Sequence, residues 1–390
     1  MVLIEFRFIV FFKWVIKMVF VASCLFGLEK LVAEDIDALG YKRLETMDGR
    51  VCFEAPLEAV ARCNIFFRYA ERLFIKLGDF EATSFDSLFE QVKALPFEEY
   101  IGEKDQFPVK GHSIRSKLFS IPDCQRIIKK AIVERLKQKY GGEHFEESGV
   151  KYQVEFFIFN DRVSIMIDTS GVGLHKRGYR LQANDAPLRE TLAAAMVRLS
   201  RPRPGVLTVD PLCGSGTIAI EAALMVTDTA PGLKRSFAGE SFSWVPKRFW
   251  DEARAEALAK IKPCETPIYG FDIDPACIEI ARANAERAGV SDLIIFEVED
   301  VRRFKSPIPD ARGTIVTNPP YGERMGEKTE TEALFKAMGK SFCENVPKWQ
   351  IYVLNCNEEF ERFFGRRADK VRKLYNGMIK CSFFQFFKNK

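Results

Sequence analysis

The chain has 390 residues and a formal net charge of +4, with 29% charged and 47% hydrophobic residues, values typical of a globular protein with two or three domains. So small a net charge does not by itself indicate a nucleic-acid-binding protein. Ten cysteines without a C-x-x-C pair and three scattered histidines indicate neither a disulfide framework nor a metal site, and the cysteines fit a reducing compartment.

The first residues allow two interpretations. The stretch from Met1 to Phe26 is apolar, but two lysines interrupt it and argue against a membrane span. Val21-Ala22-Ser23-Cys24 resembles a lipoprotein cleavage site. We favour the alternative, in which Met18–Ser23 is the first strand of a folded domain. Residues 1–17 are then an N-terminal extension, or a start site placed too early.

The N-terminal half is expected to contain two α+β units. Residues 18–59 alternate strand, helix and strand as a small ferredoxin-like unit does, and residues 60–170 form a second unit of helices and β-rich runs. The expected strands are 18–23, 51–53, 152–159 and 162–168, and the expected helices are 27–39, 85–94 and 121–139.

Basic residues gather in two places within residues 60–170. Such clusters are usually solvated surface, but they can also contact the phosphates of a nucleic acid and supply affinity without base choice. The first cluster is Lys110, His112, Arg115 and Lys117, and the second is Arg126, Lys129 and Lys130.

A glycine-rich turn opens the C-terminal domain, residues 204–390, which follows a helix-bearing connector over residues 171–203. The strand Leu207–Asp210 runs into Pro211–Thr217 and then into an apolar helical stretch that ends at Val226. A strand, a glycine turn and a helix form the nucleotide-binding start of a doubly wound sheet. No Lys-Ser or Lys-Thr follows the glycines, so a P-loop is not indicated. The long gap 227–262 is interpreted as an insertion.

Acidic residues follow the next two predicted strands. After the strand 267–271 come Asp272 and Asp274, of which we assign Asp272 to ribose hydroxyls and Asp274 to the helix N-cap. The helix that follows is expected to stop at Gly289. After the strand 293–296, Asp300 is placed to accept from an adenine amino group, although an ordinary loop carboxylate is the simpler interpretation of this residue alone. The last strands are expected at 350–354, 370–374 and 381–387.

The most informative motif is Asn318-Pro319-Pro320-Tyr321, which follows the predicted strand 313–317. Two prolines force a stiff, extended turn at the carboxyl end of a strand, where open α/β sheets bind ligands. Asn318 and the Pro319 carbonyl can accept both hydrogens of an –NH2 group, and Tyr321 can stack on a planar base. A proline-stiffened loop without chemistry is the alternative.

In this order the motifs resemble the class I S-adenosylmethionine-dependent methyltransferases of exocyclic amino groups. The likeness extends to His175–Arg180 and Ala186–Ala195, which resemble the RNA guanine-N2 methyltransferases with a THUMP domain, the large-subunit ribosomal RNA enzymes above all. It also extends to Cys24–Glu29, to Phe107–Lys110 and to the helix 125–139. The resemblance implies an α/β fold, a Rossmann-like, doubly wound seven-stranded methyltransferase sheet preceded by ferredoxin-like and THUMP domains.

The resemblance also implies the site. Asn318, Pro319, Pro320 and Tyr321 would act in catalysis, and the two basic clusters together with Arg180 would bind substrate RNA. The cofactor would be S-adenosyl-L-methionine in a cytoplasmic enzyme without metal or membrane association. Its expected contacts are Asp210, Pro211, Cys213, Gly214, Ser215, Gly216, Thr217, Asp272, Ile273, Asp300, Val301 and Asn318.

Three alternatives stay open. Transfer RNA can replace ribosomal RNA as the substrate, since THUMP methyltransferases serve both. The same turn also suits adenine N6 or a protein glutamine amide. A different class of function is an RNA-binding or assembly protein with a relict cofactor pocket. The intact motifs argue against this alternative. The sequence leaves the target nucleotide and the oligomeric state undetermined.

Overall fold

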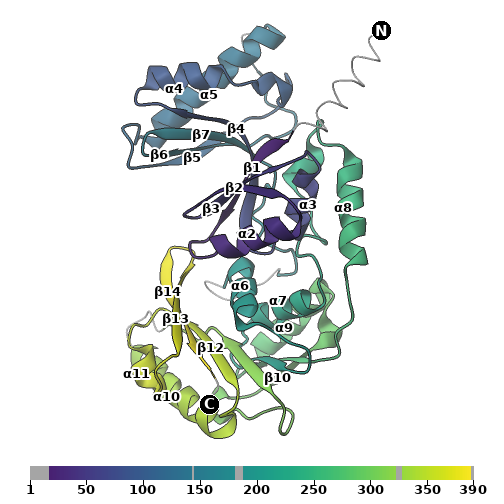
Figure 1. The fold of residues 1–390 in the computed structure, drawn as a ribbon, viewed down its shortest axis with the longest axis vertical. Coiled ribbons are helices and arrows are strands. Elements are labelled where there is room, and N and C mark those ends of the chain that lie inside the picture. Colours follow the sequence, from purple (N-terminus) through teal and green to yellow (C-terminus); the bar gives the residue numbers. More distant parts are fainter. Residues whose placement is uncertain (1–16, 143–144, 181–187, 322–326, 388–390) are drawn as a thin grey trace.

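The computed structural model describes residues 17–142, 145–180, 188–321 and 327–387. Within these residues the chain forms two seven-stranded sheets, one in each half of the sequence. Figure 1 shows the two halves one above the other along the long axis. Residues 1–16 of the predicted extension, 181–187 of the predicted connector and 322–326 after the Asn-Pro-Pro-Tyr turn lie outside the described part.

The N-terminal sheet joins the two predicted α+β units. Its strands run in the order β2-β3-β1-β4-β7-β6-β5, and neighbours are antiparallel except for β5 and β6. Strand β4 pairs with β1 of the first predicted unit and with β7 of the second. One sheet therefore spans both units, across the boundary predicted between residues 59 and 60. The strands are β1 (Met18–Cys24), β2 (Lys42–Met47), β3 (Arg50–Ala55), β4 (Ala70–Glu81), β5 (Val109–Ile114), β6 (Val154–Phe159) and β7 (Arg162–Asp168).

Two pairs of helices accompany this sheet. Helices α2 (Glu29–Ala38) and α3 (Ala59–Phe66) belong to its first part, and α4 (Phe85–Lys93) and α5 (Ile121–Tyr140) lie together over β5, β6 and β7 (Figure 1). Helix α5 buries residues at a spacing of three and four, as a helix with one apolar face does. These residues are Cys124, Ile128, Ala131, Ile132 and Leu136.

Two differences from the sequence prediction have local causes. Strand β2 was not predicted because nearly all its side chains are exposed, so this edge strand has no alternation of apolar and polar residues. Helix α2 begins at Glu29 instead of Gly27, because Gly27 has a φ of +91°. The Glu29 carboxylate accepts hydrogen bonds from the N–H of Gly27 and of Gly49, both at 2.9 Å.

The C-terminal sheet has the predicted doubly wound, seven-stranded architecture, with the order β10-β9-β8-β11-β12-β14-β13. The first five of these strands are parallel, and β14 is antiparallel to both its neighbours. The strands are β8 (Leu207–Asp210), β9 (Ile268–Asp272), β10 (Ile294–Val298), β11 (Gly313–Thr317), β12 (Gln350–Asn355), β13 (Lys370–Asn376) and β14 (Ile379–Phe386).

Helices cover both faces of this sheet. Val316 and Leu354 point into the core shared with α6 (Glu190–Ser200), α7 (Thr217–Val226) and α9 (Pro275–Ala288). Their strand neighbours Ile315 and Val353 pack on the opposite face, as the alternation of a strand requires. That face is covered by α10 (Glu327–Asn345) and α11 (Phe360–Phe364).

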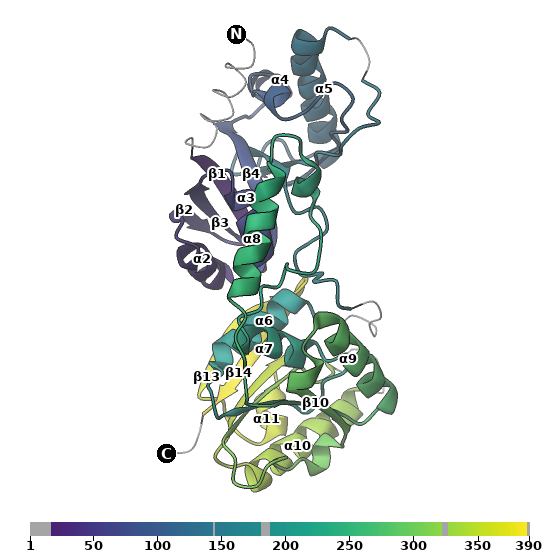
Figure 2. The same ribbon diagram turned by 90° about the vertical axis from the view of Figure 1, so that its right-hand side faces the viewer.

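The predicted insertion 227–262 packs against the N-terminal half. Its helix α8 (Lys247–Ala259) lies along α3 (Figure 2), where the Arg62 guanidinium makes two bonds of 2.8 and 2.9 Å to Glu256. Phe242 stacks on Tyr152 with the ring centroids 4.4 Å apart. The segment therefore docks the two halves together.

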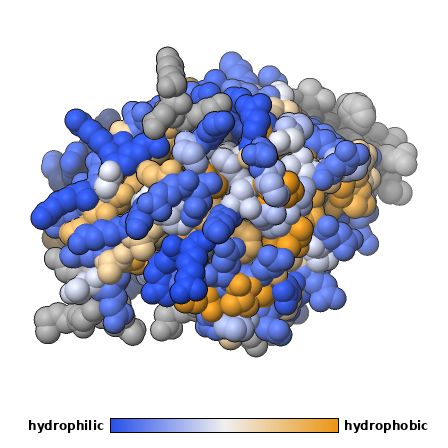
Figure 3. Space-filling model, turned by 90° about the horizontal axis from the view of Figure 1, so that it is seen from below, coloured by the Kyte–Doolittle hydropathy of each residue, from blue (hydrophilic) through white to orange (hydrophobic). Residues whose placement is uncertain are grey.

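The outer surface of the C-terminal half is largely hydrophilic in the view from below, with hydrophobic residues gathered toward its lower right (Figure 3). Across the described ranges, we find no helix with the length and apolar character needed to cross a membrane.

Candidate functional site

Strand order brings the predicted motifs to one edge of the C-terminal sheet. Strands β10, β9, β8 and β11 are adjacent and parallel, so their carboxyl ends point the same way. Asp300, Asp272, the glycine turn and Asn318, each predicted at the end of a strand, therefore follow one another along this edge. Such an edge is where doubly wound sheets bind ligands.

The glycine turn is shaped by two residues with positive φ. Gly216, with φ +82°, packs so tightly that an added Cβ would lie 3.0 Å from atoms of Ala281 and Phe296. Gly214 has φ +50°, and an added Cβ there would meet no described atom within 4 Å. Gly216 is thus required by packing against α9, whereas Gly214 leaves the backbone open to a ligand.

Asp272 binds the glycine turn directly. Its carboxylate accepts a hydrogen bond of 2.9 Å from the N–H of Gly214, and another of 3.1 Å from the N–H of Asp274. Asp274 caps α9 by accepting from the N–H of Ala276 at 2.9 Å, as the sequence suggested, whereas the ribose role of Asp272 stays a prediction. Asp272 is half-buried, so its remaining lone pairs are available to ribose hydroxyls.

Asp300, the third acidic residue at this edge, already has partners within the protein. Asp300 accepts from the N–H of Arg302 at 3.0 Å and also pairs with the Arg302 side chain at 2.7 Å. These hydrogen bonds and the positive charge hold the pKa of Asp300 below its ordinary value. Ile273, which follows Asp272, is 54% exposed, whereas Val301 is buried. Ile273 thus offers an apolar surface beside Asp272.

Asp210 ties the glycine turn to the Asn-Pro-Pro-Tyr turn. Its Oδ1 accepts from the hydroxyl of Thr317 at 2.8 Å and from the N–H of Leu212 at 3.2 Å. Asp210 is buried, and its described contacts are internal to the protein. Since Thr317 directly precedes Asn318, this bond fixes the end of β11. The sequence signal for Thr317 was its position beside the motif.

Tyr321 lies between its own turn and the β13–β14 hairpin. Its hydroxyl donates to Asn318 Oδ1 at 2.7 Å, and Cys381 Sγ lies 3.8 Å from the same hydroxyl. Burial, and then the neighbouring Cys381, raise the pKa of Tyr321. One lone pair of the Asn318 oxygen stays available to a substrate. The contact with β14 had no sequence signal, because sixty residues separate the partners.

Other predicted turn residues support the backbone. Burial raises the pKa of the Cys213 thiol well above its ordinary value, the opposite of what a nucleophilic thiolate requires. Asn284 on α9 is fully buried and donates to the carbonyl of Ser215 at 2.9 Å. Sequence reasoning missed Asn284, although a lone amide within the apolar stripe of a helix was the available signal.

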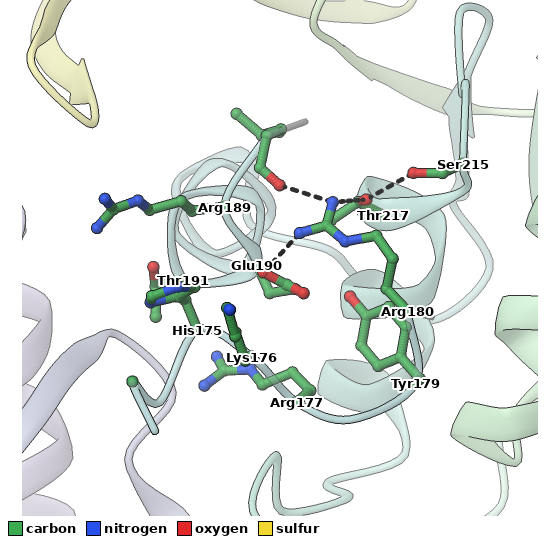
Figure 4. A network of polar contacts seen from close by, with 12 residues as sticks. His175, Lys176, Arg177, Tyr179, Arg180, Arg189, Glu190, Thr191, Ser215 and Thr217 are labelled. Carbon is green, nitrogen blue, oxygen red and sulfur yellow. Dashed lines mark hydrogen bonds and ion pairs between the residues drawn. The ribbon is translucent and has the colours of Figure 1, made fainter. Parts of the chain in front are cut away.

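Arg180 reaches the start of α7 (Figure 4). Its guanidinium donates to Thr217 Oγ1 at 3.2 Å and pairs with Glu190 Oε2 at 2.8 Å. The Arg180 side chain is only 10% exposed. Its bond to Thr217 joins the connector to the end of the glycine turn.

The predicted basic clusters lie on the N-terminal half. Arg126 pairs with Asp123, and Lys129 Nζ is 2.5 Å from Glu147 Oε1, so both charges are partly compensated. Phe119, between the two clusters, is 79% exposed and was not predicted as a contact residue. The exposed members are Lys110, His112, Arg115, Lys117, Arg126 and Lys130. In the part of the chain that the structure covers, no three His, Cys, Asp or Glu residues form a metal site.

Comparison with protein families gives three matches in chain order. Residues 19–74 match the RlmL ferredoxin-like domain, residues 82–168 match the THUMP domain, and residues 177–385 match the RMKL-like methyltransferase domain. The last match spans more than half of the chain. The protein belongs to the RMKL-like methyltransferase family. This confirms the fold and the family that the sequence motifs predicted.

Individual relatives agree with this assignment. The chain is 44% identical over 374 residues to a Bacillus subtilis (strain 168) protein named "Putative RNA methyltransferase YpsC", covering 95% of this chain and 96% of that protein. It is 35% identical to the ribosomal RNA large subunit methyltransferase K/L of Aliivibrio salmonicida, covering 91% of this chain and 51% of that enzyme. The chain thus matches about half the length of the K/L enzyme.

One solved relative bears on the cofactor. SMU.472, described as "a putative methyltransferase complexed with SAH", superposes with a TM-score of 0.88 and 37% sequence identity, covering 96% of this chain and 99% of that one. SAH is what S-adenosylmethionine becomes after losing its methyl group. With the family, this confirms the predicted cofactor, S-adenosyl-L-methionine. The open backbone at Gly214, the Asp272 carboxylate and the exposed Ile273 fit such a ligand.

Proposed function

We propose that this protein methylates the exocyclic N2 amine of a guanosine in RNA, and that the RNA is large-subunit ribosomal RNA. The observation that supports this most is the shared edge at the ends of β8, β9, β10 and β11, where the cofactor residues adjoin Asn318. The THUMP match and the name of the K/L relative support RNA, and ribosomal RNA in particular. The choice of guanine N2 rests on the resemblance of the motifs.

S-adenosylmethionine supplies an electrophilic methyl group when it is bound. The residues of the chain must then hold and activate a poor nucleophile, because the lone pair of the guanine amine is delocalised into the ring. Asn318 Oδ1 and the Pro319 carbonyl would accept the two amine hydrogens and stabilise the positive charge that develops on nitrogen. Orientation of the two reactants can contribute about 7 kcal/mol or more.

Asp210 and Tyr321 hold Asn318 in place. Asp210 fixes the preceding Thr317, and the Tyr321 hydroxyl restrains the amide through its bond of 2.7 Å. We assign the ring of Tyr321 to stacking against the base after it leaves its helix. No strong general base is needed, because the methylated amine can lose its proton to water.

The test is tritium-methyl transfer to ribosomal RNA and to transfer RNA, each purified from cells that lack the gene. Label recovered as N2-methylguanosine from large-subunit RNA is the expected result. Label only in transfer RNA would retain the chemistry and overturn the ribosomal substrate. Label recovered as N6-methyladenosine would overturn the choice of base.

The substitution Asn318→Ala should reduce kcat at saturating RNA by about 100-fold or more, since it removes an acceptor aimed at the developing charge. Calorimetric titration with S-adenosylmethionine would show whether the cofactor still binds. Asn357→Ala is the matched control, because Asn357 is also half-buried but its side chain accepts from the N–H of Glu359, just before α11. Wild-type turnover in Asn318→Ala would contradict the assigned role.

A further inference from the structure

A cavity of about 720 Å³ lies where the connector meets the segment after α7. Cationic side chains dominate its walls, with a single carboxylate among them. The lining residues are Val172, His175, Lys176, Gly178, Arg180, Arg189, Glu190, Lys234, Arg235 and Ser236.

Two of the cations are already compensated. Arg180 pairs with Glu190 at 2.8 Å, and Arg189 pairs with Glu71 Oε2 at 2.6 Å. His175 Nδ1 lies 2.9 Å from the same oxygen of Glu71. Figure 4 shows Arg180 turned toward Thr217, whereas Arg189 points away from it. The two side chains therefore lie on opposite sides of α6.

Three further cations have no acidic partner among the described residues. Arg235 donates only to backbone carbonyls, those of Gly173 at 2.8 Å and of Val172 and Lys176 at 2.6 Å. Lys176 is exposed, and Lys234 reaches only the carbonyl of Arg287 at 3.3 Å. Burial and the nearby Arg177 and Arg72 lower the pKa of Arg235 to about 10, as expected where positive charges crowd together.

The position of the cavity matters as much as its charge. Through Glu71 it adjoins β4 of the N-terminal sheet, and through Arg180 it adjoins Thr217 at the start of α7. The cavity therefore lies at the junction between the N-terminal half and the start of α7, beside the glycine turn. A polyanion is also the ligand that three uncompensated cations at the surface of such a cavity would attract.

We propose that this cavity binds backbone phosphates of the RNA substrate, with Lys176 and Lys234 as the contact residues and Arg235 as the residue that holds their loop in place. The proposal rests on the proposed function and adds to it the place where the RNA crosses between the two halves. Phosphate contacts of this kind supply affinity and register but no base choice.

The test is RNA binding by the double variant Lys176→Gln, Lys234→Gln, measured by fluorescence anisotropy with a labelled ribosomal RNA fragment over a salt series. Both lysines are exposed, so the substitution removes charge with little effect on packing. The affinity should fall by about tenfold, and the slope of log affinity against log salt should become shallower by about 2. Methyl transfer should show a raised KM for RNA with kcat unchanged.

The matched control is Lys30→Gln, Lys340→Gln, which removes the same charge from exposed residues of α2 and α10. Equal losses in both double variants would overturn the proposal, because net charge alone would then explain them. Inorganic phosphate is the second probe. Loss of phosphate binding in the double variant with unchanged RNA affinity would also overturn it, and would assign the cavity to a small anion.

The binding assay separates this proposal from the proposed chemistry. Selective loss of RNA binding in Lys176→Gln, Lys234→Gln would support the cavity even if the wild-type protein methylated no guanosine. A wild-type protein that binds no RNA would overturn both.

Discussion

At the residue scale, the buried Asp210 makes the stability of the fold depend on pH. Its carboxylate is buried at the end of β8, and burial raises its pKa from an ordinary value of 3.8 to about 7. This value is a net result, in which the hydrogen bonds from Thr317 and Leu212 oppose the effect of burial and the negative charge of Asp272 adds to it. The native protein therefore holds a proton at Asp210 over a pH range in which the unfolded chain has lost it.

The sign of the pH dependence follows from this difference. The contribution of Asp210 to stability is fully present below about pH 4 and is lost as the pH rises through about 7. In Asp210→Asn the acceptor oxygen remains but nothing titrates. The melting temperature of Asp210→Asn minus that of the wild type should therefore increase between about pH 5 and about pH 8. Thermal unfolding of both proteins at several pH values measures this.

Thr317→Val is the control for this prediction. It removes the hydroxyl that lowers the pKa of Asp210, so the melting temperature of this variant should fall more steeply with pH than that of the wild type. A difference between Asp210→Asn and the wild type that does not change with pH would show that Asp210 does not titrate in this range.

At the scale of elements, the glycine turn joins β8, α7 and α9. Gly216 ends the turn with positive φ and sits against Ala281 of α9 and Phe296 of β10. The helix start and the cofactor turn therefore depend on a close approach that only a residue without Cβ permits. Asn284 adds a hydrogen bond from α9 to the same turn.

Gly216→Ala should lower the melting temperature more than Gly205→Ala does. Both glycines have positive φ, but an added Cβ at Gly205 meets nothing within 4 Å, whereas at Gly216 it would lie 3.0 Å from two neighbours. Gly205→Ala thus measures the backbone strain alone, of about 1–2 kcal/mol. Gly216→Ala should also weaken S-adenosylmethionine binding in calorimetry. Equal effects of the two substitutions would mean that α9 moves to accommodate the methyl group.

At the scale of the whole molecule, the segment 227–262 decides how the halves sit together. Phe242 is buried against Tyr152 of the N-terminal half, and Trp244 Nε1 donates to the carbonyl of Tyr100 at 3.1 Å. With the Arg62–Glu256 pair, these contacts hold the N-terminal half against the catalytic one. Under the proposed function, an RNA that contacts both halves would depend on this arrangement.

Phe242→Ala should separate the halves, because it removes a buried aromatic contact between them at a cost of about 3–5 kcal/mol. Small-angle scattering should show a larger radius of gyration, and the KM for RNA should rise. Phe342→Ala is the matched control, since Phe342 is equally buried but lies among the helices of the catalytic half. If Phe342→Ala expanded the molecule as much, the effect would be global destabilisation and not undocking.

The sequence alone determined the elements and motifs whose signals are local. The strands ending in Asp210, Asp272 and Thr317, the helix stop at Gly289 and the role of Asp274 as an N-cap follow from periodicity and turn chemistry within short windows. The order of these motifs predicted the family and the cofactor. Strand β2 was missed because its exposed residues carry no such pattern.

Only the tertiary structure decided what depends on residues far apart in the chain. The bond from Tyr321 to Asn318 is local, but its contact with Cys381, the docking of Phe242 on Tyr152 and the basic cavity around Lys176 and Lys234 are not. Side-chain periodicity reports which face of an element is buried, but it carries no information on which distant element covers that face. For that reason the sequence predicted the chemistry at the strand ends, whereas the fold revealed the junction through which we propose RNA reaches it.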